Sequence, residues 1–322
     1  MAKCIVTGGS GFIGSHVVDA LKDSGHDVTV LDHRVEPHRK DVGFEDVDLL
    51  DAPSILATTR GADFVFHLAA VSNVNHAFKY PVYSTALNVM GTTNVLEAAR
   101  QNGVKRVVLA STVWVYNGAP STLEAADETV PFHLNGAGHI YTSTKMACEM
   151  LCHNYQTLYH VPFTVLRYGI PFGPRMREEL LIPIFLRKAL NDEPLTVAGK
   201  GDQFRKFVYV RDLADAHVLA MSENAANQIF NIEGNQTVTV LEVAEGIRSR
   251  VGDHVKIEFT PARPGDFGGR EVSNAKAKSV LGWEPRISFE GGLDRTVDWF
   301  REKWGFAARP AEQLRRTKIR TV

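Results

Sequence analysis

Cysteine is scarce in this chain of 322 residues, which contains only Cys4, Cys148 and Cys152. Three cysteines at these spacings are too few for a disulfide framework or a cysteine-rich metal site. Cys148 and Cys152 lie one helical turn apart, where small buried thiols are common. We interpret all three as structural, and we expect no bound metal.

Neither sign of charge dominates the sequence. The chain carries 36 Lys and Arg against 37 Asp and Glu, for a formal net charge of -1. Such a balance gives no overall field that would attract nucleic acid or an anionic membrane. The basic run QLRRTKIR at 313–320 is typical of a solvated terminal extension. We therefore expect no nucleic-acid partner.

Long hydrophobic runs are also missing. No apolar stretch reaches the roughly 18 residues that a membrane-spanning helix needs. The first residues, MAKCIVTGG, enter a predicted strand at once and lack the charged and then apolar layout of a secretory signal. These absences predict a cytoplasmic protein without membrane contact.

What the first half does contain is a regular alternation of short β-branched runs and longer helical patterns. The predicted strands are 3–9, 27–33, 63–70, 106–112 and 163–169, and the predicted helices are 13–25, 84–103 and 140–160. This alternation is typical of βαβ units in a doubly wound parallel sheet, an α/β Rossmann architecture. Ligands are then expected at the carboxyl ends of the strands.

The second half is more irregular and richer in Pro and Gly. Helices are expected near 180–191, 210–223, 239–251 and 289–303, with no low-complexity linker before them. We predict a nucleotide-binding domain over 1–170, a smaller, partly interleaved substrate lobe over 171–308, and a basic tail over 309–322.

A glycine-rich stretch, TGGSGFIGSH, lies between the first predicted strand and helix. Gly8, Gly11 and Gly14 would let the backbone turn tightly and approach a pyrophosphate at a helix N-terminus. Asp32 ends the second predicted strand 18 residues after Gly14, where a carboxylate can bind an adenosine ribose. A 2'-phosphate would be repelled there, which favours NAD over NADP, although the neighbouring Arg34 leaves NADP open.

Tyr141 and Lys145 lie four residues apart in HIYTSTK, within a predicted helix. Side chains at this spacing share one helix face about a turn apart. A free Tyr has a pKa of about 10, so a base working near neutral pH needs help worth roughly three units. An adjacent cation is one source of that help. Taken alone, the spacing also fits an ordinary amphipathic helix.

Several ordered motifs extend this pattern along the chain. They are HLAA at 67–70, NVMGTTNVLEAA at 88–99, LASTVWVY at 109–116, RKFVYVRDLADA at 205–216 and RPGD at 263–266. With the glycine stretch and the Tyr and Lys pair, the sequence resembles the extended short-chain dehydrogenase/reductases, in particular the NAD-dependent nucleotide-sugar epimerases and dehydratases. The resemblance runs from about residue 3 to 304.

The resemblance implies a role for individual residues. Tyr141 would be the general base, Lys145 would bind the nicotinamide ribose and hold the phenolate, and Thr112 would hydrogen-bond the reacting hydroxyl. The implied NAD-binding residues are Gly8, Gly11, Phe12, Ile13, Gly14, Asp32, His33, Arg34, Asp48, Leu49, Leu68, Ala69, Ala70, Asn88, Tyr141, Lys145 and Tyr168. The implied substrate-binding residues are Ser111, Thr112, Val113, Tyr141, Ile170, Arg177, Thr196, Val197, Arg205, Arg263 and Asp266.

Arginine suits the second set because its charged fork matches phosphate oxygens. Arg205 and Arg263 would hold the diphosphate of a nucleotide sugar, and Asp266 would take a ribose hydroxyl. Ile170 and Ala198 depart from the family's usual residues, which leaves the sugar and the base open.

Two further departures concern the reaction. The family's 4,6-dehydratases carry two acids after the Thr, and its decarboxylases keep a Glu at the second position. Here these residues are Val113 and Trp114, and neither exchanges a proton. What remains is reversible oxidation at one carbon, the central step of 4-epimerisation.

Arg177 falls where uronate 4-epimerases of the family place an Arg against the sugar carboxylate. The same motif occurs in relatives with neutral substrates, so UDP-glucuronate/galacturonate and UDP-glucose/galactose both stay open. The alternatives to epimerisation are NAD(P)-dependent reduction or oxidation of a nucleotide sugar, decarboxylation, and a redox-sensing binding module.

We also expect a homodimer, because relatives commonly pair through the helices predicted at 84–102 and 140–160. Both helices carry apolar residues beyond one face, namely Leu87, Val95, Leu96, Met146, Met150 and Leu151.

Overall fold

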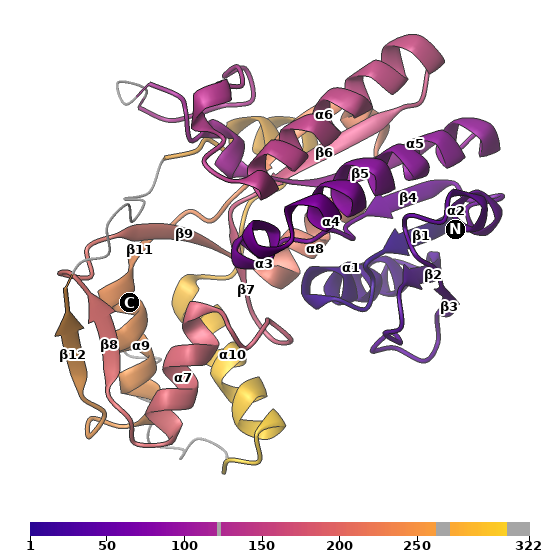
Figure 1. The fold of residues 1–322 in the computed structure, drawn as a ribbon. Coiled ribbons are helices and arrows are strands. Elements are labelled where there is room, and N and C mark those ends of the chain that lie inside the picture. Colours follow the sequence, from indigo (N-terminus) through magenta and orange to yellow (C-terminus); the bar gives the residue numbers. More distant parts are fainter. Residues whose placement is uncertain (121–123, 262–270, 308–322) are drawn as a thin grey trace. The chain divides into compact units, whose positions relative to one another are not determined.

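The computed structural model describes residues 1–120, 124–261 and 271–307, and it forms two compact units (Figure 1). The larger unit is built from Met1–Gly169, Leu213–Glu233 and Glu271–Glu284. The smaller unit begins at Ile170 and takes up the other described segments. Each unit is therefore discontinuous in sequence.

A parallel sheet of seven strands forms the centre of the larger unit, in the order β10, β6, β5, β4, β1, β2, β3. The strands are β1 (Lys3–Thr7), β2 (Asp27–Asp32), β3 (Gly43–Asp46), β4 (Phe64–His67), β5 (Arg106–Thr112), β6 (Phe163–Tyr168) and β10 (Gln228–Ile232). β5 and β6 are buried along their whole length, as strands covered on both faces must be. The predicted doubly wound α/β fold is confirmed.

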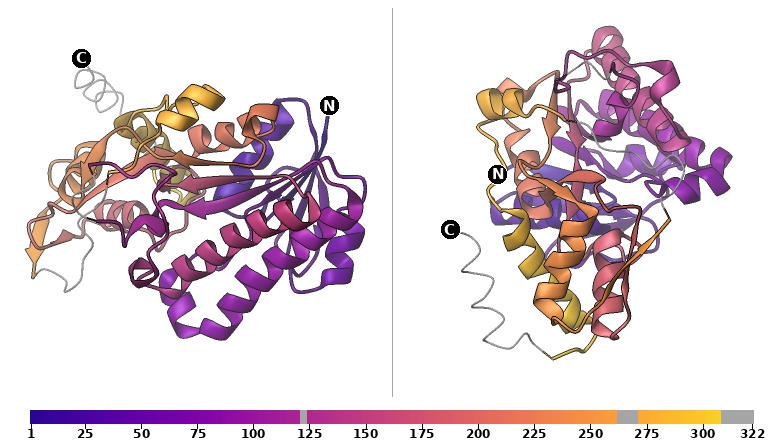
Figure 2. Two further views of the ribbon diagram at one scale, coloured as in Figure 1. Left: turned by 90° about the horizontal axis from the view of Figure 1, so that it is seen from above. Right: turned by 90° about the vertical axis from the view of Figure 1, so that its left-hand side faces the viewer.

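Helices cover both faces of this sheet. They are α1 (Phe12–Asp23), α2 (Ala52–Thr58), α3 (Val74–Lys79), α4 (Pro81–Thr85), α5 (Gly91–Asn102), α6 (Ile140–Tyr159) and α8 (Val210–Leu219), of which residues from Leu213 onward belong to this unit. α5 and α6 lie on one side of the sheet in Figure 2, left, and share a core with α2. Short helical turns are η1 (Ala86–Met90), η2 (Val113–Tyr116), η3 (Leu134–Gly136), η4 (Glu223–Ala225) and η5 (Ala277–Leu281).

The shared core explains why these helices pack where they do. Alternate residues of the strands, such as Val65, Val107 and Val165, meet Leu96 of α5 and Cys148 of α6. All three cysteines are buried and unpaired, and burial raises the pKa of each thiol, to about 12 for Cys4. Such thiols carry little thiolate at physiological pH and are unreactive.

The last strand, β10, is attached to the sheet by a buried polar network as well as by backbone pairing. Arg167 of β6 binds Glu149 of α6 at 2.7 Å, and its Nη1 donates to the Tyr116 hydroxyl at 2.6 Å. That hydroxyl donates to Asn231 of β10 at 2.8 Å. Because each member has a partner, the network fixes α6 relative to β6 and β10.

The described part of the smaller unit contains two small sheets and three helices. β7 (Ile170–Phe172), β9 (Phe204–Tyr209) and β11 (Thr237–Thr239) form one sheet, and β8 (Leu195–Ala198) pairs with β12 (Ile257–Thr260). The helices are α7 (Leu181–Leu190), α9 (Val240–Val251) and α10 (Phe289–Lys303). α9 begins with a capping box between Thr239 and Glu242.

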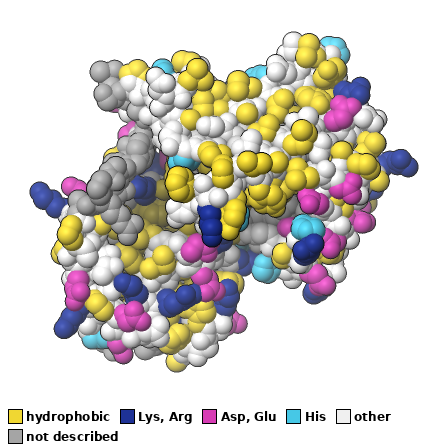
Figure 3. Space-filling view, in the orientation of Figure 1, with side chains coloured by type: hydrophobic (Ala, Val, Ile, Leu, Met, Phe, Trp, Pro, Cys, Tyr) yellow, Lys and Arg dark blue, Asp and Glu magenta, His cyan; other side chains and the backbone are white. Residues whose placement is uncertain are grey.

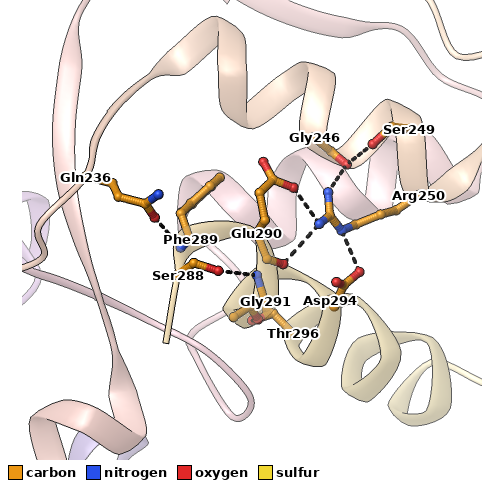
Figure 4. Close-up of polar contacts among 11 residues, drawn as sticks. Gln236, Gly246, Ser249, Arg250, Ser288, Phe289, Glu290, Gly291, Asp294 and Thr296 are labelled. Carbon is orange, nitrogen blue, oxygen red and sulfur yellow. Dashed lines mark hydrogen bonds and ion pairs between the residues drawn. The ribbon is translucent and has the colours of Figure 1, made fainter. Parts of the chain in front are cut away.

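Arg250 joins α9 to α10 (Figure 4). Its side chain is 1% exposed and lies 2.6 Å from Glu290 and 2.9 Å from Asp294. Nη1 also donates to the carbonyl oxygen of Gly246 at 2.8 Å. A buried guanidinium is stable only with such a full set of acceptors, so Arg250 fixes how these two helices pack.

Candidate active site

Glycines build the turn between β1 and α1. Gly8 has φ +70, and a Cβ placed on it would lie 2.8 Å from Cα of Ala69. A Cβ on Gly14 would lie 2.0 Å from the carbonyl oxygen of Gly8. Gly11 is the N-cap of α1 and gives it no side-chain cap, so the N–H groups of the first turn are left for an anion. Larger residues at Gly8 and Gly14 would collide with the neighbouring backbone, so this tight turn requires glycine at both positions.

Asp32 ends β2 beside this turn. Its carboxylate accepts the backbone N–H groups of Ser10 at 3.0 Å and His33 at 2.9 Å. Burial raises the pKa of Asp32, and these hydrogen bonds offset part of the rise. Arg34, two residues after Asp32, has φ +61 and donates its backbone N–H to Asp46 at 3.0 Å. The side chains of His33 and Arg34 are exposed.

Asp48 and Leu49 follow β3. The Asp48 carboxylate accepts the N–H of Leu50 at 2.9 Å, which shapes a tight turn. Leu49 is only 7% exposed and packs into the core, where a Cβ on Gly91 would lie 3.1 Å from Leu49 Cβ. Gly91 therefore lets α5 approach this segment closely.

The segment after β4 is held from two sides. His67 bridges the hydroxyls of Thr7 at 2.8 Å and Thr92 at 3.0 Å, and burial lowers its pKa to about 3. The N–H groups of Leu68 and Ala69 are bound by Thr7 through its carbonyl and hydroxyl oxygens. Neutral His67 thus fixes the start of the HLAA segment, and the partly buried Ala70 completes it.

Asn88 lies in the π-helical turn η1 and is 2% exposed. Its side chain accepts the N–H of Val71 at 2.7 Å and donates to the Val71 carbonyl at 3.1 Å and to Thr144 at 2.9 Å. The amide is therefore occupied by protein groups. It connects the segment after β4 to α6.

Tyr141 and Lys145 lie on α6, which packs against β5. Lys145 is 4% exposed, and its Nζ donates to the Ala110 carbonyl at 2.8 Å and lies 5.9 Å from the centre of the Tyr141 ring. Burial lowers the pKa of Lys145. The structure thus brings an ammonium to a phenol, as the spacing predicts.

Thr112 and Ser111 end β5 and point to opposite faces of the sheet. The Thr112 hydroxyl oxygen accepts the N–H of Trp114 at 3.2 Å, which leaves its hydrogen to donate. The Ser111 hydroxyl donates instead to Glu149 in the buried network. Val113 is 9% exposed and packs against Tyr116 and its neighbours.

Tyr168 ends β6 and is 6% exposed. Its hydroxyl lies 2.6 Å from Nε2 of His217, whose Nδ1 lies 2.9 Å from the Leu213 carbonyl. Because the carbonyl accepts, Nδ1 carries the ring proton and Tyr168 donates. Burial raises the pKa of Tyr168 and lowers that of His217 to about 4, so both are neutral.

Sequence reasoning missed His139. It is the N-cap of α6, and the centre of its ring lies 4.8 Å from that of Trp114 and 6.1 Å from that of Tyr141. The sequence did contain a signal for this role: His139 is a polar residue directly before the predicted helix, and Thr142 lies three positions later.

The remaining predicted substrate residues lie in the smaller unit. Ile170 begins β7, and Arg205 on β9 donates to the Phe204 carbonyl at 2.7 Å. On β8, Thr196 accepts from Lys188 at 3.1 Å, whereas Val197 is fully buried. Arg177 is 39% exposed and lies 3.7 Å from Glu179. Arg263 and Asp266 lie outside the described residues.

Neither a membrane-spanning helix nor a cluster of metal ligands is found among the residues that the structure describes. No helix in 1–120, 124–261 or 271–307 has the length and hydropathy to cross a bilayer. In the same ranges, no three or more His, Cys, Asp or Glu side chains are placed to hold a metal ion.

The glycine turn and Asp32 lie together at the carboxyl ends of β1 and β2, and Tyr141 and Lys145 lie on a helix that packs against β5 of the same sheet. This combination defines the extended short-chain dehydrogenase/reductases. Within that class the chain belongs to the NAD dependent epimerase/dehydratase family, whose sequence pattern matches residues 4–232.

Known proteins similar to this chain catalyse more than one reaction. A UDP-N-acetyl-alpha-D-glucosaminuronate decarboxylase of Bacillus cytotoxicus is 33% identical over 93% of this chain and 98% of its own length. The UDP-glucose 4-epimerase of Thermotoga maritima, solved with UDP-glucose, has a TM-score of 0.87 and 31% identity over 94% of this chain and 99% of that chain.

The UDP-glucuronic acid 4-epimerase of Bacillus cereus, solved with UDP-glucuronic acid and NAD, has a TM-score of 0.83 and 28% identity over 94% of this chain and 99% of that chain. NAD is thus the cofactor, and the cradle around Gly8, Gly14 and Asp32 fits it. Members of the family are enzymes, mostly acting as epimerases on nucleotide sugars, with decarboxylases and dehydratases among them.

Proposed function

We propose that the protein is an NAD-dependent nucleotide-sugar 4-epimerase, acting on UDP-glucuronate/galacturonate or UDP-glucose/galactose. The observation that carries the proposal is the pair Val113 and Trp114, which directly follows Thr112. Neither side chain exchanges protons, so the site lacks the acids that dehydration or decarboxylation would use there.

His139 does not replace them as a base. Its Nδ1 is occupied by the N–H of Thr142 at 3.2 Å, and the other ring nitrogen of a neutral imidazole then carries the proton. Tyr141 therefore remains the acid–base group, which suffices for oxidation and reduction at a single carbon.

In this reaction, residues of the chain would take one proton from the substrate and later return it. Tyr141, as a phenolate, takes the proton of the carbon 4 hydroxyl and returns it after the sugar has turned over. The nearby Lys145 cation favours the phenolate by Coulomb attraction. Thr112 donates a hydrogen bond to the reacting oxygen, which orients it.

Bound NAD would supply the hydride acceptor and donor for carbon 4 of the sugar. Gly8, Gly11 and Gly14 would hold its pyrophosphate and Asp32 its ribose. Because proton and hydride both return, the reaction consumes no cofactor.

Decarboxylation of a UDP-uronate is the second candidate, favoured by the decarboxylase at 33% identity. The two reactions share oxidation at carbon 4 and differ in the fate of the keto sugar. A decarboxylase releases carbon dioxide and a pentose, whereas an epimerase keeps every atom.

The test is to incubate the purified protein separately with UDP-glucose, UDP-glucuronate and UDP-N-acetylglucosamine, without added NAD. Products are separated by chromatography and identified by NMR, with carbon dioxide and NADH measured in parallel. We expect a 4-epimer of at least one substrate and no carbon dioxide. A pentose product, or turnover that requires added NAD in stoichiometric amounts, would refute the proposal.

A further inference from the structure

The helix that carries Tyr141 and Lys145 begins with a histidine as its cap. His139 has φ -157 and ψ 161, the extended backbone of an N-cap, and its Nδ1 accepts the N–H of Thr142 at 3.2 Å. The Thr142 hydroxyl lies 3.1 Å from the same nitrogen. Ser, Thr, Asp and Asn are the usual residues here, and none of them titrates in the neutral range when it caps a helix.

Only one form of the ring can make this cap. A backbone N–H always donates, so Nδ1 must present a lone pair and the proton must sit on Nε2. Imidazolium has protons on both nitrogens and cannot accept. It would also place a positive charge at the positive end of the helix dipole. Protonation of His139 therefore removes the cap.

The capped turn contains Tyr141 but not Lys145. Tyr141 is the second residue of α6 and Thr142 is the third, so the phenol lies inside the turn that the cap closes. Lys145 lies a turn further on and is anchored separately by the Ala110 carbonyl at 2.8 Å. Fraying of the first turn would thus displace Tyr141 and leave Lys145 in place.

The groups that face the imidazole are aromatic. Trp114 of η2 lies 4.8 Å away with an angle of 60° between the rings, and Tyr141 lies nearly parallel at 6.1 Å. Of these two rings, only that of Tyr141 titrates. Burial lowers the pKa of His139 below its ordinary 6.5, and a hydrogen bond to its own backbone offsets part of that shift.

We propose that His139 is a positioning residue for Tyr141, and that its protonation uncaps α6 and switches the enzyme off on the acid side. The inference rests on the proposed role of Tyr141. The neutral ring is the active form, so activity is complete above the folded pKa of His139 and is lost as the pH falls through it.

The first experiment compares two substitutions at this position. Asn is a strong N-cap that does not titrate, whereas Ala is no cap. We expect His139→Asn to keep kcat at pH 7.5 within about twofold and to lose less activity than the unmodified enzyme below pH 6.5, where the loss that remains comes from protonation of Tyr141 itself. His139→Ala should lower kcat about tenfold, the size of a lost cap, with unchanged NAD retention.

A second readout is independent of activity. Hydrogen exchange at pH 7.5 should be faster for the amides of 140–143 in His139→Ala than in the unmodified protein or His139→Asn. The matched control is His160→Asn at the other end of α6, where φ is 59 and Asn tolerates the left-handed backbone. This control should leave both the pH profile and the exchange unchanged.

An acid-side loss of activity that is identical in His139→Asn and the unmodified protein, or equal exchange in His139→Ala and the unmodified protein, would overturn the inference. Failure of the proposed function looks different, because no nucleotide sugar would then turn over even in the unmodified protein. In that case hydrogen exchange alone would decide whether His139 caps the helix.

Discussion

At the scale of single residues, Tyr141 depends on a cation that is itself fixed. Lys145 is buried and bound to Ala110, so its charge stays near the phenol without the entropy cost of a mobile side chain. The Thr112 hydroxyl is held by the backbone at the end of β5. These contacts fix Lys145 and Thr112 without the help of a ligand.

Removing the phenolic hydroxyl tests this arrangement. Tyr141→Phe should lower turnover about 100- to 10,000-fold, the usual cost of losing a general base. The unfolding temperature should stay close to that of the unmodified protein, because the ring remains. Near-normal turnover in a folded variant would remove Tyr141 from the mechanism.

Arg177 tests the substrate. If the sugar is a uronate, Arg177→Ala leaves a carboxylate without its partner, and catalytic efficiency for UDP-glucuronate should fall by about 30-fold or more. UDP-glucose carries no such anion and should be affected much less. Glu179 lies 3.7 Å from Arg177. The carboxylate of a uronate would therefore have to replace that of Glu179 at the guanidinium.

The comparison of the two substrates is the control for Arg177. Equal losses for both in Arg177→Ala, or equal turnover of both by the unmodified protein, would exclude a uronate-specific site. The neutral hexose would then be the substrate.

At the scale of helices and strands, Arg250 shows how the smaller unit is held together. Arg250→Ala removes the buried guanidinium that binds both Glu290 and Asp294, so we expect a loss of about 3 kcal/mol of unfolding free energy. Urea unfolding of both proteins measures this difference in free energy. The exposed pair of Arg100 with Glu97 is the matched control, and Arg100→Ala should change stability far less.

The same scale shows what the sequence could predict. Periodicity located the strands that became β1, β2, β4, β5 and β6 and the helices that became α1 and α6, because the short apolar run of a buried strand and the apolar stripe of a packed helix are both visible in the sequence. The helix predicted over 84–103 is divided by the π-helical turn η1, and β10 joins the sheet from far along the chain. Both depend on tertiary contacts, those of Asn88 and Asn231.

Within the candidate site, motif spacing predicted that Tyr141 and Lys145 would be neighbours and that the glycines would form a tight turn, because both features depend on local geometry. The resemblance favoured Thr112 over Ser111 for the catalytic role, but the sequence pattern could not predict that the Ser111 hydroxyl donates to Glu149, because that contact depends on how α6 packs. His139 was missed because His is an unusual N-cap.

At the scale of the whole molecule, the expected homodimer needs an exposed apolar surface. Val95, Leu96 and Met146, which contributed to that expectation, are buried in the core of their own unit and are not available to a partner. Others are exposed: Met90 (54%), Met150 (52%), Leu158 (65%) and Tyr159 (50%). Hydrophobic side chains gather over the region of α3 to α6 in Figure 3.

We expect a dimer by light scattering at micromolar concentration, and its dissociation by Met150→Lys combined with Leu158→Lys. Two charges in an apolar interface would be buried without partners. The control is Phe259→Lys, which changes an equally exposed apolar residue of the smaller unit (58%). A monomer in the unmodified protein would exclude the pairing.

The late position of β10 in the chain has a consequence for synthesis on the ribosome. β6 is buried along its length, yet its partner β10 is made only about 60 residues later, several seconds at ordinary translation rates. Until then the nascent sheet ends in an apolar, unpaired edge of the kind that recruits other chains. A protein cut after residue 170 would keep that edge permanently, so the Rossmann half should aggregate when expressed alone.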